Sequence, residues 1–303
     1  MNMKFKGVIP ILVTPFNNDE SVDVNSIHTM IQLMKNIEVD AVTILGVLGE
    51  ANRLTDDERK LVISSAVEAA DQLPIIVGTS SAGTRTVVNH NEIANKLGAT
   101  AVMVTPHAEP TPSEERIFNH FDTVLRAASL PVILQDHPAS TGVHMSDNLI
   151  FRMLDELTGF AGIKLESVPT APKLRSLKSR YKDQIHILTG LGALYGAYDL
   201  EAGSDGFNTG FAFPEVLIAL LREAKINNWS SVFDIYQRFL PLIDYEQHPG
   251  VAIRKELLKL RGAITNARVR SPGAQGTEDI KNTLKHIIKN TLQGTNLTKP
   301  VKL

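Results

Sequence analysis

The chain has 303 residues, of which 43% are hydrophobic and 21% are charged, a composition typical of soluble globular proteins and unlike disordered or collagen-like chains. Lys and Arg number 31 against 33 Asp and Glu, so the net charge of −2 gives no basic excess for binding nucleic acid. The sequence contains no cysteine, which excludes disulfides, thiolate metal sites and cysteine nucleophiles.

The amino-terminal sequence predicts neither a signal peptide nor a membrane span. The apolar stretch after Gly7 is only six residues long, includes Pro10, and is not followed by a small-residue cleavage site. No later segment approaches the roughly 18 unbroken apolar residues that a spanning helix needs. We therefore expect a cytoplasmic protein, and the missing cysteines are compatible with a reducing compartment.

Eight short apolar segments rich in β-branched residues are predicted to be strands. They alternate with segments whose apolar residues have helical spacing, and successive strands start between 21 and 34 residues apart. Eight repeated βα units predict an α/β fold, a closed (β/α)8 TIM barrel, with a doubly wound open sheet as the alternative. The predicted strands are Val8 to Val13, Ala41 to Leu45, Ile75 to Val77, Ala101 to Val104, Val132 to Leu134, Ala161 to Leu165, Ile185 to Leu188 and Gly206 to Thr209.

The strand pattern stops near residue 227, and three helical segments are predicted after it. At about 150 residues per domain, the length permits one or two domains. We predict that residues 1–227 form the barrel and that residues 228–303 form a C-terminal helical extension packed on it, the two making one structural unit. Among the helix boundaries, Thr55 followed by Glu58 is a capping-box pattern.

Catalytic groups of barrel enzymes lie at the carboxyl ends of the strands, so the loops that follow the strands hold the candidate residues. The informative loops are GVLGE after the second strand, TPHAEP after the fourth, QDHP after the fifth, KLE after the sixth and NTG after the eighth. The candidate site residues are Gly46, Val47, Leu48, Gly49, His107, Gln135, Asp136, His137, Ser140, Lys164, Glu166 and Asn208.

Lys164 is the most informative of these residues. Alternation along FAGIKLE predicts two faces of the strand. The face expected to point into the barrel holds Phe160, Gly162, Lys164 and Glu166, and the face expected to pack under helices holds Ala161, Ile163 and Leu165. A lysine between apolar walls has a lowered pKa and presents a free amine that can attack a carbonyl. The alternative is a lysine that merely ends a strand and reaches solvent.

Three separate motifs carry a family resemblance. GxxGE follows the second strand, VTP the fourth, and GIK ends the sixth. From about Lys4 to Leu260 the chain resembles the dihydrodipicolinate synthase and N-acetylneuraminate lyase family of class I aldolases. The resemblance implies that Lys164 forms an imine with pyruvate or another 2-oxo acid, that no metal or organic cofactor is needed, and that the protein is a homo-oligomer, a tetramer or a dimer.

The two glycines of GVLGE are expected to help bind the substrate. Gly46 and Gly49 would let the backbone approach closely and offer N–H groups to the substrate's carboxylate. The alternative is a tight turn that binds no ligand.

The sequence departs from the family's pattern at several positions. Val47 and Leu48 replace two hydroxyl residues, and Gln135 replaces the tyrosine that acts as acid and base. Ala108 stands at a second tyrosine position, and Ser140 stands where synthases have an arginine for the aldehyde's carboxylate. Glutamine cannot exchange a proton as a phenol can, and serine cannot pair bidentately with a carboxylate. These changes disfavour the family's lysine-biosynthesis reaction.

Glu166 is the predicted replacement for the missing acid/base group. It stands two residues beyond Lys164, on the same side of the strand, and apolar Val47 and Leu48 are expected to raise its pKa into a useful range. Ionised Glu166 would oppose imine formation by stabilising the lysine ammonium, a conflict that a shared proton resolves. The alternative is that Glu166 pairs with a basic residue at the rim.

Asp136, His137 and His107 are expected on the same catalytic face. There they would orient a hydroxylated substrate or supply a second acid/base group. Their spacing matches no recognised set of metal ligands, so no metal is expected. His248, just before a C-terminal helix, is expected to cap or pack, with that helix outside the barrel mouth.

The leading prediction is a Schiff-base-forming lyase, an aldolase or dehydratase, that acts through an imine on Lys164. Its substrate would be a 2-oxo acid such as pyruvate or a 2-oxo-3-deoxy sugar acid. One alternative is a genuine 4-hydroxy-tetrahydrodipicolinate synthase that joins pyruvate and aspartate semialdehyde. The other is a catalytically weak 2-oxo-acid-binding protein. The expected partner is a small molecule, not nucleic acid or a membrane.

Overall fold

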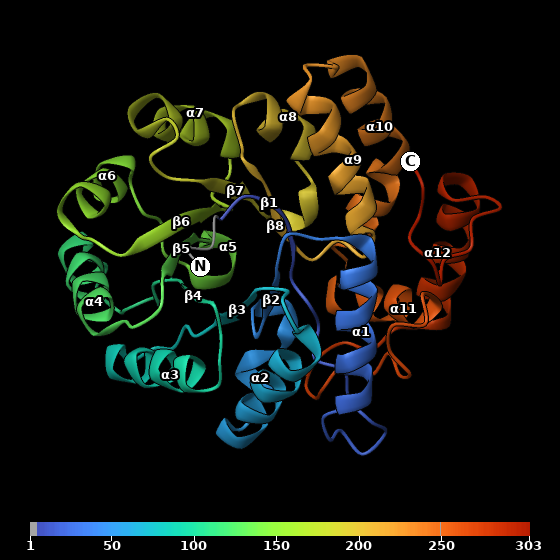
Figure 1. The fold of residues 1–303 in the computed structure, drawn as a ribbon, viewed down its shortest axis with the longest axis horizontal. Helices are drawn as coiled ribbons and strands as arrows, with labels where there is room; N and C mark the ends of the chain where they lie inside the picture. The colour runs from blue at the N-terminus through green and yellow to red at the C-terminus, as the bar shows by residue number, and fades with distance from the viewer. Residues whose placement is uncertain (1–4, 249) are drawn as a thin grey trace.

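A computed structural model describes residues 5–248 and 250–303. Its centre is one parallel sheet of eight strands in the order β1-β8-β7-β6-β5-β4-β3-β2. A parallel bridge between Ile11 and Thr43 brings β1 beside β2, and the N–H of Leu12 donates to the carbonyl of Thr43 at 2.8 Å. Helices surround the strands as a ring (Figure 1). The fold is therefore the predicted (β/α)8 TIM barrel and not an open sheet.

Each predicted strand is present, with small shifts at its ends. The strands are β1 (Gly7–Pro10), β2 (Val42–Ile44), β3 (Ile75–Gly78), β4 (Ala101–Val104), β5 (Val132–Asp136), β6 (Phe160–Leu165), β7 (Ile187–Thr189) and β8 (Gly206–Thr209).

The helices that alternate with the strands are α1 (Val24–Ile37), α2 (Asp56–Ala70), α3 (Thr84–Lys96), α4 (Glu114–Ala127), α6 (Asp147–Glu156), α7 (Thr170–Tyr181), α8 (Gly196–Glu201) and α9 (Pro214–Lys225). The loops at the barrel mouth contain short helical turns: η1 (Val47–Gly49), η2 (Ala51–Arg53), α5 (Pro138–Thr141) and η3 (Leu191–Ala193). As predicted, α2 begins with a capping box, in which Thr55 and Glu58 each accept the other's backbone N–H.

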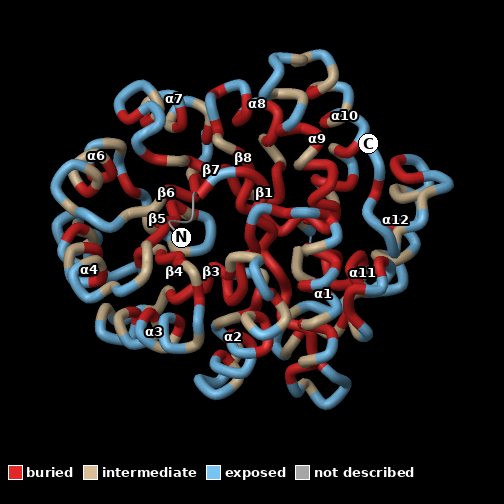
Figure 2. The backbone as a smooth tube through the Cα atoms, in the orientation of Figure 1, coloured by how far each residue is buried: buried red, intermediate tan, exposed pale blue. Residues whose placement is uncertain are grey.

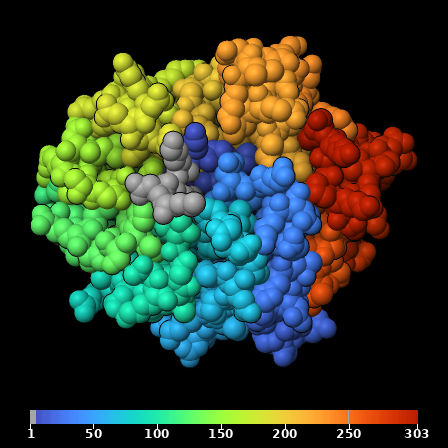
Figure 3. Space-filling model, in the orientation of Figure 1, coloured from blue at the N-terminus to red at the C-terminus, as the bar shows by residue number. Residues whose placement is uncertain are grey.

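Three further helices follow the barrel: α10 (Trp229–Tyr245), α11 (Gly250–Leu260) and α12 (Glu278–Thr291). The segment after α11 lies against α1, where the hydroxyl of Thr265 donates to the carboxylate of Asp23 at 2.7 Å. Figure 3 shows this late part of the chain beside the α1 region. Within the described residues, no helix combines the length and the apolar character required to cross a membrane. The division of the chain at residue 227 stays a prediction.

The core has one layer inside the barrel and others between strands and helices. Ile9, Ile76, Met103 and Leu188 belong to the inner cluster, to which Phe5 contributes an aromatic ring. The strands are buried, and the exposed residues lie on the outer surfaces of the helices (Figure 2). Apolar side chains therefore fill the barrel beneath its mouth, and polar groups gather at the carboxyl ends of the strands.

The start of β6 does not follow the predicted alternation. Phe160 packs outside the barrel against Phe121 of α4, with ring centroids 5.8 Å apart, whereas Ala161 packs on the inner cluster. The pairing of β5 with β6 skips Ala161. Such an irregularity shifts the alternation by one residue. The predicted faces of Phe160 and Ala161 are therefore wrong, while Gly162 and Lys164 still point inward.

Candidate active site

Lys164 and Glu166 lie together at the carboxyl end of β6. Their side chains are 3% and 5% exposed, and Nζ of Lys164 is 3.1 Å from Oε2 of Glu166. Burial lowers the pKa of Lys164, against the attraction of Glu166, which favours the ammonium. The desolvation predicted for Lys164 is therefore present, and a larger fraction of its amine is neutral than for a lysine in water.

The carboxylate of Glu166 is fixed in direction by two donors. Nε2 of Gln135 donates to Oε2 at 2.7 Å, and the backbone N–H of Leu191 donates to Oε1 at 3.0 Å. Gly190 leaves space for the carboxyl group, because a Cβ atom at that position would collide with it. Gln135 thus orients Glu166 directly.

The pKa of Glu166 moves opposite to the predicted direction. Burial disfavours its ionised form, but the charges of Lys164 and His137, together with the two hydrogen bonds, outweigh burial and lower the pKa. The prediction that apolar Val47 and Leu48 raise this pKa is wrong, because polar donors and a cation contact the carboxylate. Glu166 therefore favours its ionised form, which can accept a proton.

His137 and Ser140 continue this polar group toward the surface. Nδ1 of His137 is 3.8 Å from Oε2 of Glu166 and forms a hydrogen bond of 2.6 Å with Oγ of Ser140. Burial lowers the pKa of His137, which favours the neutral imidazole. Ser140 is exposed. The structure thus brings Lys164, Glu166, His137 and Ser140 into one chain of polar groups.

Asp136 is not part of this group. Alternation along β5 turns its side chain away from the barrel interior, and its Oδ2 lies 2.7 Å from Nζ of Lys173 on α7. The expectation that Asp136 faces the substrate is therefore wrong.

Asn208 lies in the barrel wall. Its Nδ2 donates to the carbonyl of Ile9 and to Oγ1 of Thr43, both at 2.9 Å. It therefore links β8 to β1 and β2. A role for Asn208 in binding substrate stays a prediction.

A cavity of about 730 Å³ opens at the mouth on one side of Gln135. It extends over the loops that follow β2, β3 and β4. The predicted site residues that line it are Gly46, Val47, His107, Gln135 and Ser140. Because Gln135 both lines the cavity and contacts Glu166, the cavity adjoins the Lys164 and Glu166 pair.

The GVLGE loop forms a 3-10 turn whose amides are only partly available. The N–H of Gly49 donates to the carbonyl of Gly46 at 3.0 Å, so the expectation that Gly49 offers its amide to a ligand is wrong. In a 3-10 turn the amides before the first such bond have no partner within the turn. Here those are the N–H groups of Val47 and Leu48, and Val47 is 57% exposed.

Sequence reasoning missed Arg254, a buried residue of α11. Its Nε donates to Glu246 at 3.0 Å, and its positive charge adds to the effect of burial in lowering the pKa of Lys164. A Cβ atom at Gly192, in the loop after β7, would lie 2.9 Å from Nη2 of Arg254. The helix after His248 therefore reaches the barrel mouth, contrary to prediction, while His248 itself is exposed. The signal in the sequence is two adjacent basic residues within the apolar segment VAIRKELL.

Metal ligands do not gather at this site. In residues 5–248 and 250–303, no group of three His, Cys, Asp or Glu side chains is arranged to hold a metal ion.

Comparison with known proteins adds three relatives and a family. The model of the dihydrodipicolinate synthetase family matches residues 4–291. The chain is 31% identical over 275 residues to an L-2-keto-3-deoxyarabonate dehydratase from Azospirillum brasilense, covering 89% of each chain. It superposes on a dihydrodipicolinate synthase from Rhodopseudomonas palustris with a TM-score of 0.91 and 28% identity, covering 96% of this chain and 99% of that one. YagE, a prophage protein from E. coli K12 solved in complex with pyruvate, gives a TM-score of 0.86 and 26% identity, covering 94% of this chain and 98% of that one.

Proposed function

This chain belongs to the dihydrodipicolinate synthetase family, and we propose on that basis that it is a Schiff-base-forming lyase for a 2-oxo acid, acting through an imine on Lys164. The observation that carries the proposal is the buried lysine amine 3.1 Å from the carboxylate of Glu166. The dehydratase relative supports a 2-oxo-3-deoxy sugar acid as the substrate, and the pyruvate complex of YagE supports a 2-oxo acid in general.

Imine formation begins at the carbonyl of the substrate. The neutral amine of Lys164 attacks C2, and the resulting carbinolamine loses its hydroxyl group as water to give an iminium ion. The iminium ion withdraws electrons from the bonds at C3, so a proton there becomes acidic. Glu166 accepts this proton, and an enamine forms. In a dehydratase the enamine then expels the C4 hydroxyl group, which takes the proton from Glu166 and leaves as water. In an aldolase the iminium ion keeps its C3 proton, and Glu166 instead accepts the proton of the C4 hydroxyl group while the bond between C3 and C4 breaks to give an aldehyde and the enamine.

Other residues bind and orient the substrate in this proposal. The amides of Val47 and Leu48 take its carboxylate, and Gln135 keeps Glu166 aimed at C3. His107 and Ser140, which line the cavity, and His137, which is hydrogen-bonded to Ser140, are the proposed contacts for the hydroxyl groups of a longer chain. A cavity of about 730 Å³ has more space than pyruvate fills, which supports a sugar acid as the substrate.

We also propose a cytoplasmic homo-oligomer, a tetramer or a dimer. The family resemblance supports the oligomer, and a sequence without cysteine is compatible with a reducing compartment. Light scattering coupled to size-exclusion chromatography measures the oligomeric state, and a monomer at micromolar concentration would contradict this part of the proposal.

Borohydride trapping tests the central step. The protein is incubated with pyruvate or with one of a panel of 2-oxo-3-deoxy sugar acids, reduced, and mapped by peptide mass spectrometry. We expect an adduct on Lys164 that is absent from the Lys164→Arg variant. Lys173 and Lys255 are internal controls, because both are largely buried and each is paired with a carboxylate. No adduct on Lys164 with any 2-oxo acid would refute the proposal.

Turnover assays separate the remaining functions. We expect release of water or cleavage products from at least one sugar acid. Efficient turnover of pyruvate with aspartate semialdehyde, and of nothing else, would instead identify a synthase. Trapping on Lys164 without turnover of any substrate would identify a binding protein.

A further inference from the structure

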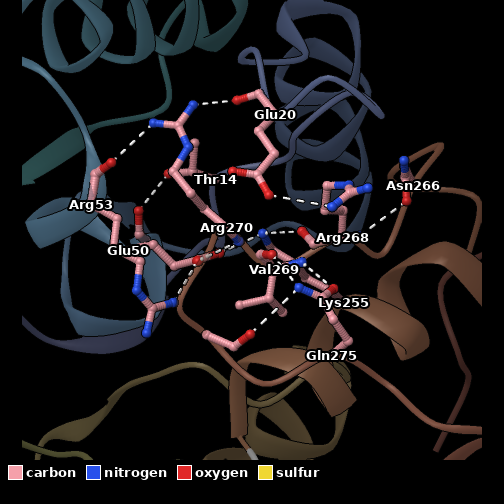
Figure 4. Close-up of polar contacts among 12 residues, drawn as sticks. Thr14, Glu20, Glu50, Arg53, Lys255, Asn266, Arg268, Val269, Arg270 and Gln275 are labelled. Carbon is pink, nitrogen blue, oxygen red and sulfur yellow. Dashed lines mark hydrogen bonds and ion pairs between the residues drawn. The ribbon is translucent and has the colours of Figure 1, made fainter.

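The carboxylate of Glu50, after β2, accepts hydrogen bonds from three donors. Glu50 ends the GVLGE turn and is 1% exposed. Oε1 accepts from Nζ of Lys255 at 2.5 Å, while Oε2 accepts from Nη1 of Arg53 at 2.7 Å and from the backbone N–H of Arg270 at 3.0 Å. These donors converge on one side chain in Figure 4.

The backbone of Glu50 has an unfavourable conformation that these contacts stabilise. Its φ of 51° lies in the left-handed region, which costs a residue with a Cβ atom about 1–2 kcal/mol. Glu50 belongs at once to the end of η1 and to the start of η2, so its conformation sets how the two turns join. A conformation of this kind persists when the surrounding contacts enforce it.

Lys255 is enclosed as completely as Glu50. Its side chain is 0% exposed, and Nζ also donates to the carbonyl of Arg268 at 2.7 Å. The ring centroid of Phe16 lies 4.3 Å from the same nitrogen. The ammonium therefore has no alternative partner in solvent, and its position is fixed relative to the loop that follows β1.

The turn is also held from two other directions. The hydroxyl of Thr14, after β1, donates to the carbonyl of Gly49 at 2.6 Å. The guanidinium of Arg270 donates to the carbonyl of Arg53 at 3.0 Å and to the carboxylate of Glu58 at 2.6 Å. Residues of the C-terminal segment thus hold the loop after β2 at Glu50 and at Arg53 (Figure 4).

We propose that Glu50 and Lys255 are positioning residues, a buried ion pair through which the C-terminal segment holds the GVLGE turn in the shape that binds the substrate's carboxylate. This inference rests on the proposed function. Neither residue lines the cavity, and the proposed reacting groups, Lys164 and Glu166, lie at the carboxyl end of β6. The pair therefore acts on substrate affinity through the turn and not on the chemistry at Lys164.

Removal of one partner predicts a specific kinetic change. In Lys255→Met, Glu50 loses its fully buried counter-charge and keeps only Arg53, whose side chain is 26% exposed. This loss favours a reorganised loop that brings the carboxylate to water. The amides of Val47 and Leu48 then lose their alignment. Because Lys164 and Glu166 keep their contacts, the half-saturating substrate concentration rises while the rate at saturation changes little.

The experiment measures borohydride trapping on Lys164 as a function of pyruvate concentration. For Lys255→Met we expect the half-saturating concentration to rise by about fivefold or more, with the maximal trapped fraction unchanged. Glu50→Gln, which keeps the shape of the side chain, should shift the curve in the same direction. This second variant keeps the inference testable if Lys255→Met folds poorly.

Arg261→Met is the matched control. Arg261 is 0% exposed at its side chain and forms a buried pair with Glu215 of α9, with Nη2 and Oε1 2.5 Å apart, but it does not contact the GVLGE turn. We expect this variant to melt at a lower temperature with an unchanged trapping curve.

These measurements distinguish failure of the positioning role from general destabilisation and from failure of the proposed function. Unchanged half-saturation in both Lys255→Met and Glu50→Gln would overturn the inference. An equal shift in Arg261→Met would overturn it as well, because the effect would then be general destabilisation. No adduct in the wild-type protein would refute the proposed function, and the positioning role would fail with it.

Discussion

The proposed base, Glu166, has neighbours that favour its ionised form. Lys164 and Gln135 contact one carboxylate oxygen and Leu191 the other, so the group is both charged and oriented before substrate binds. Such an arrangement reduces the reorganisation that proton transfer requires. The same contacts place the carboxylate beside Nζ of Lys164, the nitrogen of the proposed iminium ion.

Replacing the base should separate imine formation from turnover. For Glu166→Gln we expect trapping on Lys164 to persist and turnover of the identified substrate to fall by about 10²- to 10⁴-fold. Asp199→Asn serves as a control, because Asp199 is a buried carboxyl of α8 that binds Thr170 and Thr189 instead of Lys164. Turnover of Glu166→Gln within a factor of two of wild type would exclude Glu166 as the base.

Site residues placed by contacts local in the sequence could be predicted, whereas those placed by contacts between distant parts of the chain could not. Strand alternation predicted that Lys164 and Glu166 share a side, because neighbours on one strand have a fixed relation. The prediction that the Gly49 amide binds a ligand was wrong, because that N–H donates to the carbonyl of Gly46 within the same turn. Arg254 and Lys255 were not predicted as site residues, because their partners come from distant parts of the chain and no local pattern specifies them.

At the scale of elements, the connection between α10 and α11 carries a titratable group. Glu246 is 0% exposed and accepts from Nε of Arg254 at 3.0 Å and from the N–H of Ala212 at 3.1 Å. Burial raises the pKa of Glu246 to about 7, although Arg254 acts in the opposite direction. Between the unfolded value of about 4.5 and this folded value, native Glu246 retains a proton that the unfolded chain has released.

The free energy of unfolding should therefore contain a contribution from Glu246 that is present below about pH 4.5 and is lost as the pH rises toward about 7. Glu246→Gln cannot ionise and lacks this dependence. We expect the free energy of unfolding of the variant, relative to that of wild type, to be on the order of 1–3 kcal/mol higher at pH 8 than at pH 5. Urea denaturation at the two pH values measures this difference. A stability difference that is the same at both pH values would contradict the prediction.

The β6 strand shows where element prediction succeeds and where it stops. Its existence follows from an apolar, β-branched segment, and its length was predicted to within one residue. The skipped pairing at Ala161 depends on how β5 is positioned beside it, which is a property of two strands. The amino-acid pattern of one strand contains no information on that offset, so Phe160 was assigned to the wrong side.

At the scale of the whole molecule, the C-terminal helices and the barrel share contacts that predict joint unfolding. Trp229 is the only tryptophan and lies in α10, packed against the apolar cluster that also holds Phe207 of β8. If the chain is one structural unit, tryptophan fluorescence and far-ultraviolet circular dichroism should give the same urea midpoint. Fluorescence that changes at clearly lower urea than the helical signal would show instead that the extension unfolds separately.

The contacts that Lys255 and Arg270 make with Glu50 can form only late in the synthesis of the chain. The turn that they hold is made early, but Lys255 and Arg270 emerge 205 and 220 positions later. At about 5–20 residues per second, a ribosome needs on the order of 10–40 seconds to supply them. A nascent chain therefore contains Lys164, the proposed nucleophile, well before the GVLGE turn gains these contacts. A product terminated ahead of residue 255 keeps Lys164 but never forms the ion pair between Glu50 and Lys255.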